Sequence, residues 1–143
     1  MRLVIQRVKY ARVSVGGKIV SEIGIGFLIL VGVGREDSED DIMRLAKKVS
    51  TLRIFEDNNG KMNMNIQNIK GEILSVPQFT LYADTTRGNR PGFEQAAGPR
   101  MADELWQKFN NRLKEMGLTL KTGLFGEHME IELVNDGPVT IIY

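Results

Sequence analysis

The sequence predicts an α+β fold: a barrel-like, largely antiparallel β-sheet with two main helices packed on it. Three observations predict this class. Strand-like segments come in runs, only two long stretches have helical spacing, and 143 residues that are 42% hydrophobic can fill one core. A wound α/β fold would instead need a helix between most consecutive strands. We therefore expect a single domain over residues 1–143.

Strand patterns dominate the first part of the chain. Apolar residues alternate with polar ones over 3–15, and Gly16-Gly17 is typical of a hairpin turn. A second strand over 18–23 leads through glycines into the continuous apolar run 27–31, which is typical of a strand buried on both faces.

Two segments have the spacing of amphipathic helices. The first begins after Ser38, a good N-cap with an acidic residue three positions later, and its apolar stripe extends to Leu52. The second opens at Gly98-Pro99, where proline suits the first turn, and ends at Gly117.

A later strand is predicted over 72–83, although polar residues and a proline interrupt it. Proline removes a ladder donor, so Pro77 indicates a sheet edge or a distortion. Period-2 alternation places Gln78 and Thr80 on one face, where they either line a pocket or are half-exposed at an edge.

The end of the chain contains one more strand and an ambiguous segment. Apolar and acidic residues alternate over 129–133, as in a half-exposed strand. The following segment 135–140 contains Asp-Gly and Gly-Pro steps, which are typical of an ordinary turn.

Composition excludes several kinds of site. The chain has no cysteine, which excludes disulfides and thiolate chemistry, and its single histidine, His128, cannot form a two-histidine metal site. We expect no metal and no other cofactor. His128 is expected to lie exposed on the polar face of a strand.

The chain is expected to be soluble and cytoplasmic, without membrane contact. No segment approaches the roughly 18 consecutive apolar residues of a membrane span, and charged residues interrupt the start too often for a secretory signal. The net charge of +1 neither requires nor excludes a nucleic-acid partner.

Two local features bear on phosphate binding. Gly32-x-Gly34 does not complete a phosphate-loop pattern. The loop with Arg87 and Arg90 either contacts phosphates, since guanidinium groups suit their geometry, or is simply solvated. Residue patterns alone therefore indicate an α+β domain with a candidate polar pocket and do not name a reaction.

Five motifs occur in an order that resembles the D-aminoacyl-tRNA deacylases, across essentially the whole chain. They are MRLVIQRV at the start, LRIFED at 52–57, QFTLYAD at 78–84, RGNRPGF at 87–93 and NDGPVT at 135–140. The resemblance implies a homodimer with active sites at the subunit interface. It also implies hydrolysis of the ester joining a D-amino acid to the 3′ end of tRNA, and of glycyl-tRNA mischarged on tRNA-Ala.

The resemblance also implies roles for individual residues. Gln78 and Thr80 match the family's SQxT motif with Phe79 between them, and backbone amides near Phe79 and Thr80 would hold the substrate carbonyl. Gly137-Pro138 matches a Gly-cisPro motif that reaches into the partner's site, grips the substrate α-amino group and blocks L side chains.

Four further positions bear on the substrate: Arg7 and Pro77 on chirality by resemblance, and Arg87 and Arg90 on tRNA contact. Arg7 matches an arginine that supports the Gly-cisPro motif, and Arg87 and Arg90 are candidate tRNA contacts. Pro77 stands where the motif has serine, so a serine nucleophile is excluded there. A PQxT version also resembles a sister group of animal deacylases that admit L-alanine. Arg7 and NDGPVT favour the D-specific group.

Two mechanisms fit the residues present. Thr80 could attack the ester, but no base is visible beside it. We favour the alternative, in which the protein positions the ester and the ribose 2′-hydroxyl of the terminal adenosine assists an attacking water. Two other classes stay open: a tRNA- or protein-binding module without catalysis, and a general small-ester hydrolase.

Overall fold

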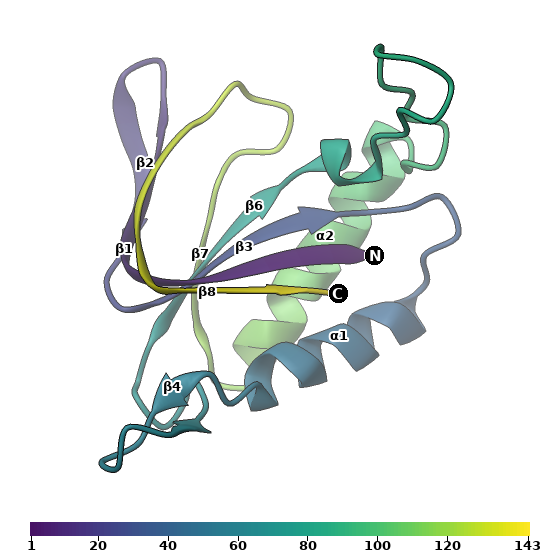
Figure 1. Ribbon diagram of the computed structural model, residues 1–143. Coiled ribbons are helices and arrows are strands. Elements are labelled where there is room, and N and C mark those ends of the chain that lie inside the picture. The colour runs from purple at the N-terminus through teal and green to yellow at the C-terminus, as the bar shows by residue number, and fades with distance from the viewer.

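Strand β1 is the centre of the sheet because other strands pair with both of its edges (Figure 1). Val4, for example, pairs with Leu30 of β3 on one side and with Ile142 of β8 on the other. The computed structural model describes residues 1–143. Its elements are β1 (Arg2–Val15), β2 (Lys18–Ile23), β3 (Gly26–Gly32), α1 (Glu39–Thr51), β4 (Phe55–Glu56), β5 (Met62–Met64), β6 (Glu72–Pro77), the 3-10 helix η1 (Phe79–Tyr82), α2 (Pro99–Glu115), β7 (Thr119–Thr122) and β8 (Glu130–Ile142).

The main sheet is mixed, with antiparallel pairs in the majority. β1 pairs antiparallel with β2, β3 and β8, whereas β3–β6 and β6–β7 are parallel. β4 and β5 form a separate two-stranded sheet. The strand order is β2-β1-β3-β6-β7, in which β3 pairs with residues 2–8 of β1 and β2 with residues 11–15 along the same edge. β8 pairs along the other edge of β1. The predicted α+β class is confirmed.

Side chains, and not a backbone ladder, bring the two ends of the curled sheet together. Ser21 Oγ of β2 donates to the carbonyl of Thr122 in β7 at 2.6 Å, and Lys121 Nζ donates to the carbonyl of Glu22 at 2.6 Å. The Glu72 carboxylate accepts the N–H of Gly24 at 2.8 Å, and this hydrogen bond lowers its pKa. The barrel-like shape predicted from the runs of strands follows from these contacts.

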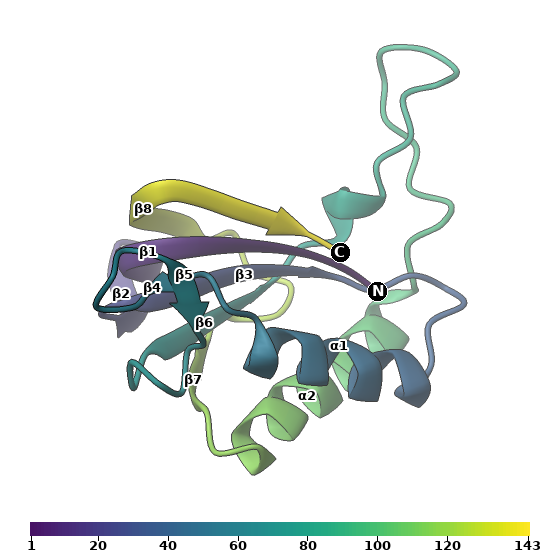
Figure 2. The same ribbon diagram turned by 60° about the horizontal axis from the view of Figure 1, so that its bottom comes forward.

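Two apolar cores result from this arrangement. α1 and α2 lie together on one face of the sheet, and β8 is the strand of the sheet drawn farthest from them (Figure 2). The larger core lies between the helices and the sheet, and the smaller one lies inside the curl of the strands. Each fully buried large side chain contributes roughly 1.5–3 kcal/mol relative to exposure; these side chains include Phe27, Phe109, Leu45, Ile73 and Trp106.

Both predicted helices are confirmed at their ends. Ser38 caps α1, where its backbone N–H donates to the Asp41 carboxylate at 3.2 Å. Pro99 opens α2, and Gly117 follows its end with φ +82°, a conformation that favours glycine. Neither helix combines the length and apolar character needed to cross a lipid bilayer.

The prediction of one strand over 72–83 is wrong in its second half. β6 ends at Pro77, and η1 follows it. The last backbone hydrogen bond between β6 and β3 runs from the N–H of Gln78 to the carbonyl of Val31 at 2.8 Å. The ladder stops there because its partner strand β3 ends one residue later. Alternation therefore does not set the directions of Gln78 and Thr80.

Two predictions near the C-terminus are also corrected. Residues 135–140 form no ordinary turn, since β8 continues through them to Ile142. Four residues of β8, 136–139, bulge outward opposite the single residue Arg7 of β1, between the pairs Gln6–Thr140 and Val8–Asn135. His128 is exposed as expected but lies just before β8 and not on a strand.

We predict that Ser75→Ala destabilises the fold. The buried Trp106 Nε1–H donates to Ser75 Oγ at 2.9 Å, and the substitution leaves this donor unpaired, at a cost of about 1–3 kcal/mol. Trp106 is the only tryptophan, so urea unfolding followed by its fluorescence measures the effect at the site itself. Ser14→Ala, half-buried in β1, is the control. Equal stability of the two variants would contradict the role given to this hydrogen bond.

Candidate active site

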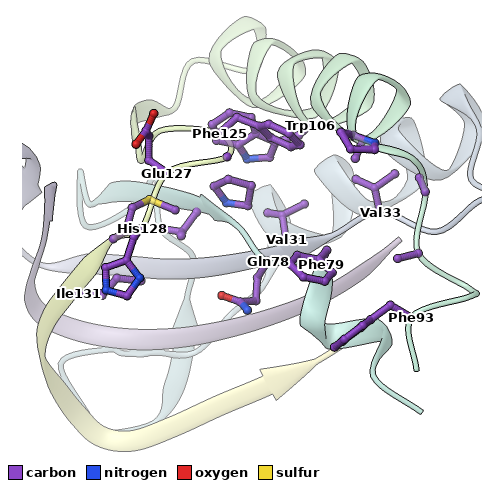
Figure 3. Close-up of a pocket in the computed structure, with 18 residues that line it drawn as sticks. Val31, Val33, Gln78, Phe79, Phe93, Trp106, Phe125, Glu127, His128 and Ile131 are labelled. Carbon is purple, nitrogen blue, oxygen red and sulfur yellow. The ribbon is translucent and has the colours of Figure 1, made fainter. Parts of the chain in front are cut away.

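An apolar cleft of about 680 Å³ opens beside the end of β6 (Figure 3). β3, β6, α2, the loop before α2 and the segment that leads into β8 supply its walls. Twelve of its eighteen lining residues are hydrophobic, so its occupant must present mainly apolar or aromatic surface. The size suits a group such as a nucleoside, since ligand sites span roughly 300–1,000 Å³.

Aromatic rings stand at both ends of the cleft. Trp106 and Phe125 lie with ring centroids 6.0 Å apart on the α2 side. Phe79 and Phe93 meet edge to face at 4.9 Å near the mouth, where Phe79 is 56% exposed. A large exposed ring beside an open cleft offers a surface on which a flat group can stack.

The segment Pro77-Gln78-Phe79-Thr80 forms one wall and the rim. Pro77, Gln78 and Phe79 line the cleft, whereas Thr80 lies exposed just outside it. Gln78 Nε2 donates a hydrogen bond to Thr80 Oγ1. The structure thus brings the predicted polar pair together through the turn of η1 and not through strand alternation.

Arg7 fixes the bulge that contains Gly137-Pro138. Its side chain is buried, at 6% exposure. Nε donates to the carbonyl of Asp136 at 2.9 Å and lies 3.3 Å from the Asp136 carboxylate, and Nη1 donates to the carbonyl of Ile54 at 2.5 Å. The Gly137-Pro138 peptide bond is cis. One guanidinium therefore ties the bulge to the segment after α1.

Gly137 and Pro138 do not line the cleft of their own chain. Both are exposed on β8, whose outer edge has no strand partner. This edge also exposes Ile142 (74%) and Val134. Within one chain the structure thus forms two separate groups: residues 77–80 at the cleft, and Arg7 with Gly137-Pro138 on β8.

Arg87 and Arg90 lie on a long loop between η1 and α2 that projects from the body (Figure 2). Its base is pinned by paired backbone hydrogen bonds between Asp84 and Gly92, at 2.8 and 2.9 Å. The N–H of Thr86 donates to the Asp84 carboxylate and lowers its pKa. Phe93, at the end of the same loop, reaches the cleft, so the two arginines belong to a segment that borders the site.

Sequence patterns did not reveal several lining residues. Phe125, Glu127 and His128 reach the cleft from the loop before β8, and Trp106 reaches it from α2. Trp106 belonged to a predicted buried helix face, a pattern that does not distinguish a core position from a cleft wall. No local motif marks the other three.

Comparison with known proteins places the chain in a family. Residues 4–143 match the family described as D-Tyr-tRNA(Tyr) deacylase. The chain belongs to this family. A D-aminoacyl-tRNA deacylase of Symbiobacterium thermophilum is 55% identical over 142 residues, which cover 99% of this chain and 94% of that protein. A D-aminoacyl-tRNA deacylase of Staphylococcus epidermidis is 52% identical over 143 residues, covering 100% and 95%.

Two solved structures share the fold of this chain. One described as a c-Myc DNA unwinding element binding protein is 37% identical, with a TM-score of 0.94 over 100% of this chain and 97% of that one. Another, described as a probable eukaryotic D-amino acid tRNA deacylase, is 16% identical, with a TM-score of 0.85 over 99% and 97%, and supports the fold alone. Family membership confirms the predicted deacylase, an enzyme of the hydrolase class.

We predict that Arg7→Lys destabilises the protein although the charge is kept. A lysine cannot reproduce the fork that reaches Asp136 and Ile54 together, and losing a buried hydrogen bond from a charged group costs about 1.5–3 kcal/mol. Arg12→Lys is the control, because Arg12 pairs with Glu132 on the surface, where ion pairs contribute roughly 0–1 kcal/mol. Urea unfolding compares the two; an Arg7 variant as stable as the Arg12 variant would refute this role.

Proposed function

We propose that the protein hydrolyses the ester of D-aminoacyl-tRNA, and of glycyl-tRNA mischarged on tRNA-Ala, and leaves L-aminoacyl-tRNA intact. The observation that carries this proposal is the position of the Phe79–Thr80 turn at the mouth of an apolar, aromatic cleft, in a chain of the deacylase family. Because the proposed substrate is made in the cytoplasm, we place the enzyme there.

The cleft would hold the 3′-terminal adenosine. Its volume and its aromatic walls, Trp106 with Phe125 and Phe79 with Phe93, suit a flat, uncharged base. A base seated among these rings would place the ribose near the rim, beside η1. Every tRNA ends in the same adenosine, so this pocket would accept all tRNAs alike.

The backbone of η1 would hold the ester. The first N–H groups of a helix have no partner within it, so those of Phe79 and Thr80 are available to the ester carbonyl oxygen. Donors aimed at an oxygen on which negative charge develops lower the barrier, and each is worth about 2.7–4 kcal/mol in comparable enzymes. Gln78 would support this turn through its hydrogen bond to Thr80.

Thr80 is a poor candidate for a nucleophile. Its Oγ accepts a hydrogen bond from the Gln78 amide, which cannot take up a proton. Among the residues that line the cleft, only Glu127 and His128 are ionisable, and both come from the loop before β8 and not from η1. We therefore favour attack by water assisted by the ribose 2′-hydroxyl of the substrate.

Chirality would be read by a second copy of the chain. The free edge of β8 and its exposed apolar residues Val134 and Ile142 suit pairing with another β8 in a homodimer. Such a dimer would bring the exposed Gly137-Pro138 of one subunit to the cleft of the other. Their carbonyl groups would grip the α-amino group and occupy the space that an L side chain needs, so rejection by clash accounts for tolerance of many D residues.

Two narrower alternatives follow from particular observations. Pro77 in the motif favours a relaxed pocket that also cleaves L-Ala-tRNA. One structural relative is described as a DNA unwinding element binding protein, which favours a nucleic-acid-binding role without catalysis. In that case Arg87 and Arg90 would contact the nucleic acid backbone while no ester is cleaved.

The deciding experiment compares the loss of D-Tyr-tRNA, L-Tyr-tRNA, Gly-tRNA and L-Ala-tRNA with purified protein. We expect fast loss of the D-tyrosyl and glycyl esters and persistence of L-Tyr-tRNA. Loss of L-Ala-tRNA as well would identify the relaxed pocket. Saturable tRNA binding with no cleavage would leave the binding role. A D-Tyr-tRNA ending in 2′-deoxyadenosine, linked through its 3′-hydroxyl, should be cleaved at least about 100-fold more slowly if the 2′-hydroxyl assists.

We predict that Gly137→Ala abolishes most D-Tyr-tRNA cleavage. Gly137 has φ +130°, and a Cβ atom there would stand 2.9 Å from the backbone nitrogen of Val139 and 3.3 Å from Arg7 Nη2. Because the methyl group would displace the bulge, we expect a loss of about 100-fold or more. Gly60→Ala is the matched control, with φ +72° in open space in the turn between β4 and β5. Unchanged turnover of D-Tyr-tRNA by Gly137→Ala would contradict the role of this segment.

A further inference from the structure

The short helix η1 is poorly held by packing. None of its four residues is buried, although its first turn lies at the mouth of the cleft. Segments with few buried contacts open locally at low free energy. Something other than apolar burial must therefore keep the N–H groups of Phe79 and Thr80 in place.

Arg2 of β1 holds η1 from one side. Its Nη1 donates to the carbonyl of Leu81 at 2.8 Å. The same guanidinium lies over the ring of Tyr82, with Cζ 4.4 Å from the ring centroid. A cation within about 6 Å of a ring face is attracted to it. One side chain thus contacts two consecutive residues at the C-terminal end of η1.

The segment after β3 supports Tyr82 from the other side. The Asp37 carboxylate accepts the N–H of Gly34 at 2.6 Å and a longer hydrogen bond from the Tyr82 hydroxyl at 3.4 Å; the amino group of Met1 also contacts it. Gly34 makes this approach possible, because a Cβ atom there would stand 2.6 Å from the Tyr82 oxygen. Burial, together with the charge of Asp37, raises the pKa of Tyr82 to about 12, so the hydroxyl stays a donor.

We propose that Arg2 and Tyr82 are positioning residues for the deacylation, which orient the backbone of η1 without touching the substrate. This inference rests on the proposed function. Arg2 and Tyr82 are absent from the cleft lining, and the Arg2 guanidinium is engaged by Leu81 and the ring. Catalytic donors that shift by about 1 Å lose on the order of 100-fold in rate, so a clamp at one end of a one-turn helix can govern the chemistry at its other end.

The first test is steady-state deacylation of D-Tyr-tRNA by Arg2→Gln and Tyr82→Leu. We expect each to lower kcat at least tenfold with KM changed less than threefold. Tyr82→Phe keeps the ring under Arg2 and should retain at least a third of the wild-type kcat. Arg12→Gln is the matched control, an exposed arginine of the same strand with a surface partner, and should behave as wild type. A raised KM with unchanged kcat would mean that Arg2 contacts tRNA directly, and would overturn the proposal.

The second test does not depend on catalysis. The N–H groups of Leu81 and Ala83 donate to the carbonyls of Gln78 and Thr80 and so hold the turn of η1 together. The rate of hydrogen exchange at these two N–H groups therefore reports how well ordered this helix is. We expect at least tenfold faster exchange in Arg2→Gln than in wild type or Arg12→Gln, with global unfolding unchanged. Unaltered exchange would refute the clamp. Faster exchange in a protein that cleaves no aminoacyl-tRNA would instead support the clamp and refute the proposed function.

Discussion

The pairing of β1 along both edges is the constraint on which the rest of the molecule depends. β3 and β2 follow one another along one edge, and β8 occupies the other. This one strand carries Arg2, which contacts η1, and Arg7, which fixes the bulge of β8. Both halves of the proposed site are therefore attached to the same central, rigid element.

The bulge of β8 shows how a regular sheet can present an irregular backbone. Arg7 replaces the ladder bonds that four bulged residues cannot make, by donating to the carbonyl of Asp136. A buried guanidinium needs several acceptors, and the carbonyl of Ile54 supplies another. The same interaction thus satisfies the arginine and exposes Gly137-Pro138 at the edge of the sheet.

Features set by interactions between residues close in sequence were predictable, and features set by distant residues were not. The two helices and the hairpin at Gly16-Gly17 were predictable because caps, turns and apolar periodicity act between residues close in sequence. Residues 78–83 were predicted as strand because Phe79, Leu81 and Tyr82 are apolar or aromatic. Residues 79–82 form η1 because the pairing strand β3 ends at Gly32. Gly32 has no side chain, so Leu81 can approach it. Both causes lie far away in the sequence, where local patterns do not reveal them. The turn predicted at 135–140 was wrong for the same reason: Asn135 and Thr140 pair with β1, so the residues between them form a bulge in a strand and not a turn.

By itself the sequence determined the fold class, the two helices, the absence of cysteine chemistry and, through its ordered motifs, the deacylase family. Only the tertiary structure decided that residues 77–79 line an aromatic cleft, that Thr80 lies outside it, and that Gly137-Pro138 does not line the cleft of its own chain. The physical reason is that the proposed chemistry uses backbone N–H and carbonyl groups, which every residue possesses. Residue types cannot reveal such groups; their positions become visible only when distant segments are packed together.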